Sequence, residues 1–217
     1  MNFQIPDYPD LTYGSIYCIG RNYAEHIEEM KSSRTKEPVV FLKPRSSVVH
    51  NGGKVILPPQ SEDVHHEAEL VLLIGAEGKN LAVDKSLDIV KALAIGIDFT
   101  ARDLQSEAKK GGKPWTLSKG FDTFAPVGNF VPLNNKIDPG NLTISLQVNG
   151  VEKQNDNTHL MIFTVQEIVS YLTHKFTLTP GDLIFTGTPK GVSRVTAGDN
   201  IRAALQQDLS IISVDVT

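Results

Sequence analysis

The sequence has only one cysteine, Cys18, among its 217 residues. A single cysteine cannot form an intrachain disulfide, and it excludes a zinc site built from several cysteines. Long hydrophobic runs are missing as well, since the longest, residues 70–74, is far shorter than the roughly 20 residues of a membrane-spanning helix. The first 15 residues have neither the basic nor the hydrophobic region of an export signal. We therefore expect a cytoplasmic protein that does not enter a membrane.

Charge of one sign is not concentrated anywhere in the chain. The 21 basic and 25 acidic side chains give a net charge of −4, and they are interspersed. A nucleic acid or an anionic membrane as the main partner would require a basic surface patch. The charge pattern therefore argues against both.

The length and composition fit one globular domain. Hydrophobic residues make up 40% and charged residues 21% of the chain, which is ordinary for a globular protein. A chain of this size can bury a sizeable core without disulfides or structural zinc. No repeat, low-complexity tract or linker interrupts it, so we expect residues 1–217 to form a single domain.

Short segments rich in β-forming residues dominate the sequence, and turn signals separate many of them. The predicted strands are residues 15–19, 39–42, 55–57, 68–74, 93–99, 142–148, 183–185, 201–205 and 209–216. Asn149-Gly150, between two of the β-rich segments, predicts a tight hairpin.

Four helices are predicted from hydrophobic periodicity and capping signals. The clearest covers residues 164–174, where Thr164 and Glu167 form a capping box. The others cover residues 84–93, 100–110 and 22–32. Strands outnumber helices and do not alternate regularly with them, which predicts a mainly β, mixed α+β fold rather than a doubly wound α/β sheet.

Common signatures of phosphate, dinucleotide, serine-hydrolase and zinc-protease sites are absent from the sequence. The first positive signal is Glu67 and Glu69, which a strand would place on one face. Burying two like carboxylates beside Val71 and Leu73 is costly unless a cation compensates them. The alternative is that both glutamates lie at the exposed end of the strand.

Asp98 is the second signal, because it ends a nearly continuous hydrophobic run. Taken alone, it is better explained as a strand-end residue that accepts backbone N–H bonds. Together with Glu67 and Glu69, however, it offers an oxygen-only site for Mg²⁺ or Mn²⁺, with Ca²⁺ as an alternative. Three carboxylates would leave other coordination positions for water or substrate, as in a catalytic metal site.

His26 and Glu29 are the third signal. Three residues apart on a predicted helix, they share a face and can form a hydrogen bond, and a carboxylate that orients a histidine commonly makes a general base. Such a pair is more often part of a solvated surface. This helix, however, has a thin hydrophobic stripe, which is typical of a lid that closes over a site.

An anionic substrate at three carboxylates and one divalent cation would need additional positive charge. The sequence candidates are Arg21, Lys119 and Lys190, although most lysines are simply surface residues. Thr188, in the glycine-rich segment 185–191, could supply a further donor.

Taken together, six motifs make the chain resemble the fumarylacetoacetate hydrolase family, in particular its short acylpyruvase and oxaloacetate decarboxylase-like branch. They are IGRNYAEHIEEM at 19–30, FLKP at 41–44, HHEAEL at 65–70, GIDFTARD at 96–103, WTLSK at 115–119 and TGTPKGV at 186–192. The resemblance implies the fold of that family's C-terminal domain, a mixed β-roll or sandwich with short flanking helices, usually as a homodimer. Residues 1–14 would then be a short N-terminal extension in place of the β-barrel domain of longer members.

The resemblance also implies roles for individual residues. Glu67, Glu69 and Asp98 match the ligands of Mg²⁺ or Mn²⁺ in the family. His26 and Glu29 match a water-activating dyad on a lid helix, within residues 22–36. Lys119 matches the lysine beside the reacting oxygen, and the substrate-contacting positions are matched by Arg21, Gln105 and Thr188.

The implied chemistry is the stabilisation of an enolate of a small anionic keto acid. We expect a metal-dependent hydrolase that cleaves the C–C bond of acylpyruvates to pyruvate and a carboxylate, with oxaloacetate decarboxylation or tautomerisation as side activities. The alternative within the family is an isomerase or decarboxylase of a longer unsaturated keto-dicarboxylate. A catalytically silent protein that binds metal or keto acids is the alternative from another class, and the presence of all the acid, base and metal positions argues against it.

Overall fold

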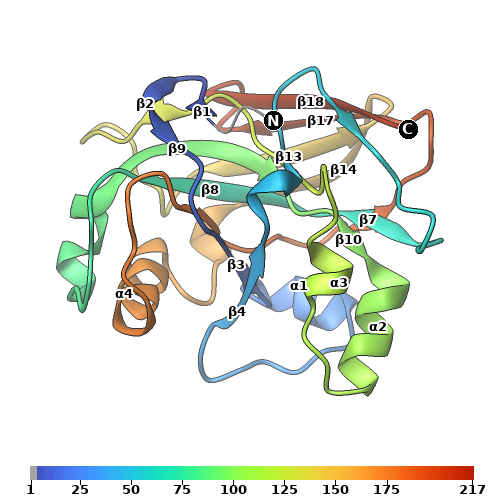
Figure 1. Cartoon of the computed structure of the whole chain (residues 1–217), viewed down its shortest axis with the longest axis horizontal. Coiled ribbons are helices and arrows are strands. Elements are labelled where there is room, and N and C mark those ends of the chain that lie inside the picture. The colour runs from blue at the N-terminus through green and yellow to red at the C-terminus, as the bar shows by residue number, and fades with distance from the viewer. Residues whose placement is uncertain (1–3) are drawn as a thin grey trace.

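Two large β-sheets packed on each other form the body of the protein in the computed structural model, which describes residues 4–217 (Figure 1). The first sheet has six strands in the order β12-β9-β8-β15-β3-β4. Their bounds are Val131–Pro132 (β12), Val90–Ile97 (β9), Ala68–Ile74 (β8), Leu183–Phe185 (β15), Ile16–Gly20 (β3) and Val39–Lys43 (β4).

The second sheet has five strands in the order β14-β13-β17-β18-β6. They are Val151–Asn157 (β14), Thr143–Val148 (β13), Asn200–Leu205 (β17), Ser210–Val216 (β18) and Lys54–Val55 (β6). A small third sheet joins Thr100–Ala101 (β10), Val64–His66 (β7) and Ser193–Arg194 (β16). Two strand pairs complete the β-structure, Gln4–Ile5 (β1) with Tyr8–Thr12 (β2) and Val48–Val49 (β5) with Ala125–Pro126 (β11).

Short helices lie at the edges of the sheets. The α-helices are Ala24–Glu29 (α1), Arg102–Lys110 (α2), Thr116–Lys119 (α3) and Val165–Lys175 (α4), and the 3₁₀ helices are Arg45–Ser47 (η1), Val83–Ile89 (η2) and Thr158–Leu160 (η3). Figure 1 shows α1, α2 and α3 gathered at one end of the molecule, away from α4. The mainly β, mixed α+β fold expected from the sequence is confirmed.

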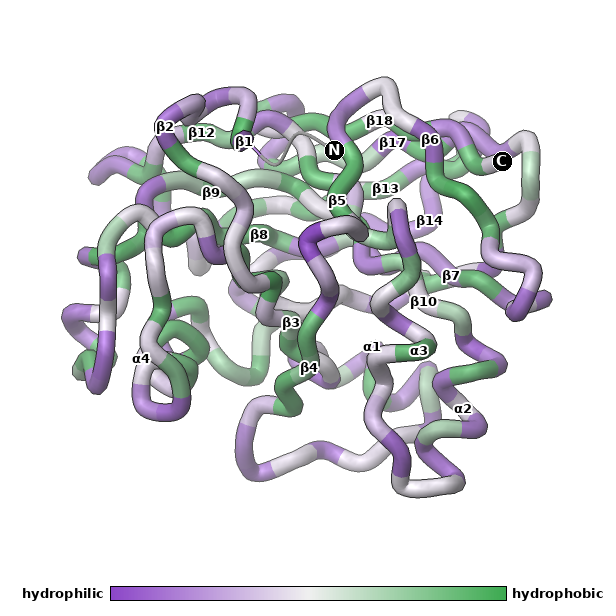
Figure 2. Tube along the Cα trace, in the orientation of Figure 1, coloured by the Kyte–Doolittle hydropathy of each residue, from purple (hydrophilic) through white to green (hydrophobic). Residues whose placement is uncertain are grey.

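Strand β8 lies in the middle of the first sheet and is buried on both faces. Leu70 and Leu72 belong to the core between the two large sheets, whereas Val71 and Leu73 face a second hydrophobic cluster on the other side. Figure 2 shows the hydrophobic colour concentrated on these strands and the hydrophilic colour on peripheral loops. The neighbouring strand approaches closely at Gly96, where a Cβ would lie 2.5 Å from the Val71 side chain. This tight pairing fixes the ends of β8 and β9, where the acidic residues lie.

Several local predictions are confirmed. Residues 68–74 and 183–185 form strands with the predicted bounds. The β13–β14 hairpin turns at Asn149 and Gly150, both with positive φ, as a tight hairpin turn requires. Helix α4 begins with the predicted capping box between Thr164 and Glu167.

Three helix predictions need correction. Residues 84–93 were predicted as one helix, but a 3₁₀ helix ends at Ile89 and strand β9 follows, because its hydrophobic residues pair with β8. The helix expected to start near Thr100 starts at Arg102, because Thr100 and Ala101 pair with β7.

The helix expected over residues 22–32, within the predicted lid 22–36, extends only from Ala24 to Glu29. Its N-cap is Tyr23 and not Asn22. The Asn22 side chain is fully buried instead, where it donates to the carbonyls of Phe163 and Thr186 and accepts the N–H of Phe163.

No helix within residues 4–217 is long and hydrophobic enough to cross a membrane.

Candidate active site

Three carboxylates converge where β8 begins and β9 ends. Glu67 lies between β7 and β8, Glu69 is on β8, and Asp98 directly follows β9. The antiparallel register pairs Ala68 with Ile97, and the Asp98 N–H donates to the Glu67 carbonyl at 2.8 Å. Ligand oxygens of all three side chains lie within 4.8 Å of one another. None of the three is more than 4% exposed, so the interpretation that the glutamates lie at an exposed strand end is wrong.

Buried cations compensate two of these carboxylates. Lys119 Nζ lies 2.7 Å from Glu67 Oε2 and 2.6 Å from Asp98 Oδ2. Arg102 Nη2 lies 2.5 Å from Glu67 Oε1, and Lys43 Nζ lies 2.7 Å from Asp98 Oδ1. Asp98 therefore pairs with lysines rather than with backbone N–H groups, which was the alternative expected from its place at the end of a strand.

The three carboxylates do not share this compensation equally. Burial alone would raise the pKa of Glu67, but Lys119 and Arg102 outweigh it and hold that pKa well below the usual value. Burial, followed by the nearby Asp98 and Glu67 carboxylates, raises the pKa of Glu69 well above its usual value. Burial would lower the pKa of Lys119, but Asp98 and Glu67 raise it. Glu69 forms no ion pair within residues 4–217, and the nearby Lys119 and the hydrogen bond from the Gly187 N–H only partly offset the negative charges around it.

The donor set fits a divalent cation. Lys43 donates its hydrogen bonds to the carbonyls of Phe99, Lys119 and Phe124, so Asp98 Oδ1 has the lysine charge nearby but no hydrogen bond. A buried oxygen in this state has lone pairs available to a metal. Carboxylate oxygens are the preferred ligands of hard cations such as Mg²⁺ and Mn²⁺. Glu67, Glu69 and Asp98 would therefore hold such an ion.

The histidine–glutamate pair is formed as the sequence predicts. His26 Nδ1 lies 3.2 Å from Glu29 Oε2. The Gly191 N–H donates to Glu29 at 3.1 Å, and Gly191 has a φ of +95° at a point where a Cβ would lie 2.1 Å from the Lys153 carbonyl. Burial would raise the pKa of Glu29, but hydrogen bonds from His26 and Gly191 lower it. Glu29 is therefore an anionic partner that orients the imidazole.

Helix α1 is not simply a solvated surface element. His26 and Ile27 are buried, and Tyr23 forms a β-bridge with Met161. On the outer side, Lys190 Nζ lies 2.7 Å from Glu25 Oε2. Lys190 is therefore a surface partner of α1 and does not line the pocket. Closure of the segment over a ligand stays a prediction.

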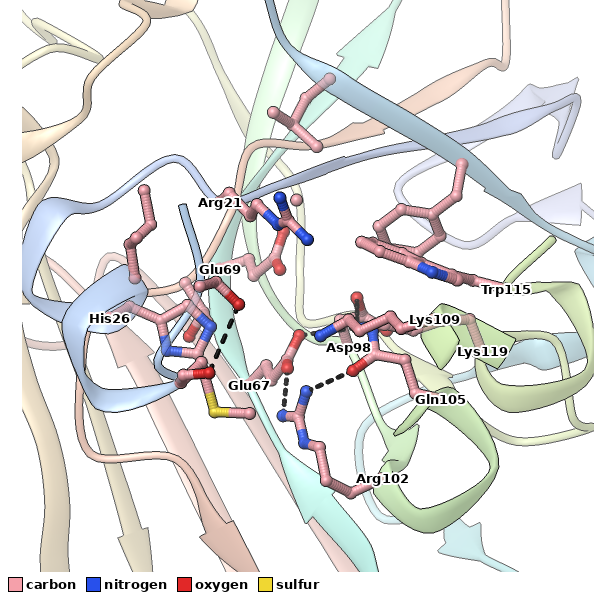
Figure 3. Close-up of a pocket in the computed structure, with 17 residues that line it drawn as sticks. Arg21, His26, Glu67, Glu69, Asp98, Arg102, Gln105, Lys109, Trp115 and Lys119 are labelled. Atoms are coloured by element: carbon pink, nitrogen blue, oxygen red, sulfur yellow. Dashed lines mark hydrogen bonds and ion pairs between the residues drawn. The ribbon is translucent and has the colours of Figure 1, made fainter. Parts of the chain in front are cut away.

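Most of the residues predicted to bind metal or substrate or to act in catalysis line one pocket (Figure 3). Its walls include eight of the nine, Arg21, His26, Glu67, Glu69, Asp98, Gln105, Lys119 and Thr188. The ninth, Glu29, does not line the pocket but contacts His26. In Figure 3, His26 is on the opposite side of the pocket from Lys119 and Trp115. The cavity volume is about 30 Å³, room for about one or two water molecules, so a small acid and a metal ion would require the pocket to widen.

The three predicted substrate-contacting residues differ in how freely they can bind. Gln105 Oε1 accepts a hydrogen bond from Arg102 at 2.8 Å. The Thr188 hydroxyl donates to the Ala68 carbonyl and accepts from Gln154, so it is largely used within the protein. Arg21 Nε is buried without a hydrogen-bond partner. Arg21 is therefore the one of the three with a buried unpaired donor.

Sequence reasoning assigned no role to four residues at or beside the pocket: Lys43, Arg102, Lys109 and Trp115. Arg102 and Lys109 share one face of α2 with Gln105, a periodicity that could have revealed them. Lys43 is the last residue of strand β4, and nothing local indicates that the protein buries it.

Replacing Lys43 with methionine should destabilise the fold markedly. The change removes a buried cation from Asp98 and the lysine hydrogen bonds to three buried carbonyls, of which, within residues 4–217, only that of Phe124 also accepts a backbone N–H, from Phe99. Breaking a buried ion pair costs about 3–5 kcal/mol, so urea denaturation of Lys43→Met should show a loss of that size. Lys36→Met, at an exposed lysine, is the matched control. Equal stability of the two variants would contradict the role of Lys43.

Comparison with known proteins identifies the family of this chain. The family described as fumarylacetoacetate (FAA) hydrolase C-terminal matches residues 15–216. The chain belongs to the fumarylacetoacetate hydrolase family. The resemblance stated from the six motifs is thereby confirmed.

Relatives within this family have named activities. Oxaloacetate tautomerase FAHD1, mitochondrial, of Rattus norvegicus is 44% identical over 197 residues, covering 91% of this chain and 89% of the relative. The crystal structure of fumarylpyruvate hydrolase from Pseudomonas aeruginosa in complex with Mn²⁺ and pyruvate is 38% identical, with a TM-score of 0.90 over 95% of this chain and 91% of that chain. A putative fumarylacetoacetate isomerase/hydrolase from Oleispira antarctica is 31% identical, with a TM-score of 0.93 and full coverage of both chains. This is a family of enzymes, and the Mn²⁺ complex of one neighbour supports a divalent cation at the acidic site found here.

Proposed function

We propose that this protein is a divalent-metal-dependent enzyme that interconverts the keto and enol forms of oxaloacetate, and that the same site hydrolyses acylpyruvates. The observation that carries the proposal is the arrangement of the pocket. A buried histidine held by a carboxylate lies across it from three buried carboxylates and a buried lysine. The 44% identity to a named oxaloacetate tautomerase supports the first reaction. The likeness to a fumarylpyruvate hydrolase with bound pyruvate supports the second.

Both reactions require negative charge to be stabilised on the oxygens of a 2-oxo acid. A divalent cation held by Glu67, Glu69 and Asp98 would supply a Lewis acid for that purpose. Lys119 adds a buried positive charge beside Glu67 and Asp98, where it can interact with the developing enolate oxygen. Arg102 holds Glu67 and positions Gln105, both of which line the pocket.

In tautomerisation, a proton moves between C3 and the 2-oxygen of oxaloacetate. His26 would take that proton and return it, and the contact of its Nδ1 with Glu29 supports this role as a base. A base that shuttles one proton completes the reaction without water.

In hydrolysis, His26 would take a proton from a water molecule, which then attacks the distal carbonyl of an acylpyruvate. The C–C bond breaks to give a carboxylate and the enolate of pyruvate, which recovers a proton. Lys119 would stabilise the oxyanion. Decarboxylation of oxaloacetate gives the same enolate by loss of CO₂ and does not need the activated water.

A substrate and metal panel tests this function. Protein stripped with EDTA should lose activity and regain it with Mg²⁺ or Mn²⁺, because the three carboxylates supply no Lewis acid of their own. Ultraviolet absorbance follows the enol of oxaloacetate, and a coupled assay follows pyruvate released from acetylpyruvate, fumarylpyruvate and oxaloacetate. Reactions with free metal and no protein provide the control. Full activity after exhaustive chelation would overturn the proposal.

The homodimer, the cytoplasmic location and the lid over residues 22–36 stay predictions that accompany this function.

A further inference from the structure

Two of the four cations that line the pocket have no anionic partner. Arg102 and Lys119 pair with the metal-site carboxylates. Arg21 and Lys109 also line the pocket, yet neither forms an ion pair with any residue among 4–217. A partly buried positive charge without an anionic partner is unfavourable unless something supplies the opposite charge. The pocket therefore contains two positive charges, on Arg21 and Lys109, that no carboxylate within residues 4–217 pairs with.

Lys109 is placed in the pocket by the periodicity of α2. Arg102, Gln105 and Lys109 follow one another at intervals of three and four residues, so one polar face of the helix lines the site. Lys109 is half-buried, and its Nζ lies 5.3 Å from the centroid of the Trp115 ring. Burial, followed by the positive charges of Arg102 and Arg21, lowers the pKa of Lys109 to about 8. Its surroundings thus disfavour a second cation when no anion is bound.

Arg21 approaches the same pocket from the loop after β3. Its backbone adopts the left-handed region, with a φ of +62°, which costs a non-glycine residue on the order of 1 kcal/mol or more. One side of the guanidinium donates to the Ser33 carbonyl at 3.3 Å, while the buried Nε has no partner. A strained residue with an unused buried donor is typical of a binding site.

The charge balance at the carboxylates does not require Arg21 and Lys109. With a divalent cation bound and Glu69 ionised, Glu67, Glu69 and Asp98 would carry three negative charges, balanced by three positive charges on Arg102, Lys119 and Lys43. A divalent cation is sufficient for the carboxylate and the 2-oxo group of a substrate. Arg21 and Lys109 are then in excess, which favours a substrate with a second negative charge at its far end.

We propose that Lys109, assisted by Arg21, forms a second anion subsite that selects 2-oxo acids carrying a distal carboxylate. This inference rests on the proposed function and names its substrate class, the 2-oxo dicarboxylic acids. Lys109 acts in specificity, because it contacts the far end of the substrate and not the bond that changes.

The test compares substrates with and without the distal carboxylate. In Lys109→Met, kcat/KM for oxaloacetate or fumarylpyruvate, whichever the wild type prefers, should fall about 10- to 100-fold, the worth of a hydrogen bond between charged groups. The fall should appear mainly in KM. For acetylpyruvate, which has no distal carboxylate, kcat/KM should change less than about threefold. Inhibition by pyruvate should be unchanged.

Two further variants exclude a purely structural effect. Lys109→Arg should restore the preference for the dicarboxylate, and Lys110→Met, at the exposed neighbouring lysine on α2, should leave it intact. The preference should also weaken as the pH rises through about 8, where Lys109 loses its proton, and it should persist in Lys109→Arg. The groups facing Lys109 (Arg21, Arg102, Glu67 and Lys119) remain in that variant, so the difference reports Lys109 itself.

The outcomes distinguish this inference from the proposed function. No turnover of any keto acid by the metal-loaded wild type would overturn the proposed function. Turnover with equal losses for dicarboxylate and monocarboxylate substrates in Lys109→Met, or with no loss, would overturn the second subsite alone.

Discussion

Replacing Asp98 with asparagine should abolish the tautomerase, hydrolase and decarboxylase activities together. The change keeps the size of the side chain but removes its negative charge and replaces one oxygen by an amide nitrogen, at one of the three carboxylates proposed to bind the metal. A bound cation stabilises the transition state by several kcal/mol. The loss of activity should therefore be about 10³-fold or more for each reaction.

Direct metal binding separates this effect from misfolding. Calorimetric titration with Mn²⁺ should show much weaker binding to Asp98→Asn than to the wild type. Asp88→Asn, at an exposed aspartate, is the matched control and should bind Mn²⁺ normally. Circular dichroism should show the variant folded, because Lys43 keeps its three carbonyl partners. Wild-type Mn²⁺ affinity in Asp98→Asn would contradict the assignment of the metal site.

The cluster of three carboxylates could be predicted because its signals are local. Glu67, Glu69 and Asp98 all interrupt or end hydrophobic segments that must be buried, and a buried carboxylate requires compensation. The pairing of β8 with β9 then brings them together. The sequence did not show that lysines and an arginine would compensate two of them while Glu69 forms no ion pair with any residue that the structure describes.

The boundaries of the helices were harder to predict than those of the strands. Residues 84–93 have a hydrophobic spacing that fits a helix, but Val90, Ala92 and Leu93 pair with β8 instead. Asn22 is a residue type that often caps a helix, but its side chain donates instead to the buried carbonyls of Phe163 and Thr186. In each case, contacts with distant parts of the chain overrode a local preference.

Lys43 and Lys109 show why part of the site could not be predicted. A lysine in a sequence is most often exposed. Lys43 is buried because three backbone carbonyls and Asp98 converge on it from elsewhere in the chain. Lys109 lines the pocket because helix α2 lies at the edge of the pocket. Neither environment can be derived from the neighbouring residues.

Replacing His26 with alanine should separate the reactions that need a base from the one that does not. Acylpyruvate hydrolysis and oxaloacetate tautomerisation both require proton transfer, so each should slow about 10²- to 10⁴-fold, the usual contribution of general base catalysis. Decarboxylation of oxaloacetate begins with the loss of CO₂, which requires no base. It should slow by less than about tenfold.

The comparison requires equal metal occupancy and a matched control. Mn²⁺ content should be measured for each variant, because a loosened metal site would imitate the loss of a base. His159→Ala, at an exposed histidine, should leave all three rates unchanged. Glu29→Gln should follow the pattern of His26→Ala with smaller losses, since it keeps the imidazole but weakens its anionic partner.

The pattern of rates then decides the role of the pair. Selective loss of the two proton-transfer reactions places His26 at the reacting atoms, with Glu29 orienting it. Equal losses in all three reactions would mean that α1 serves the site only by excluding water, because no base is common to the three. Unchanged hydrolysis in His26→Ala would show that another group activates the water, and the 3.2 Å contact between His26 and Glu29 would then be structural.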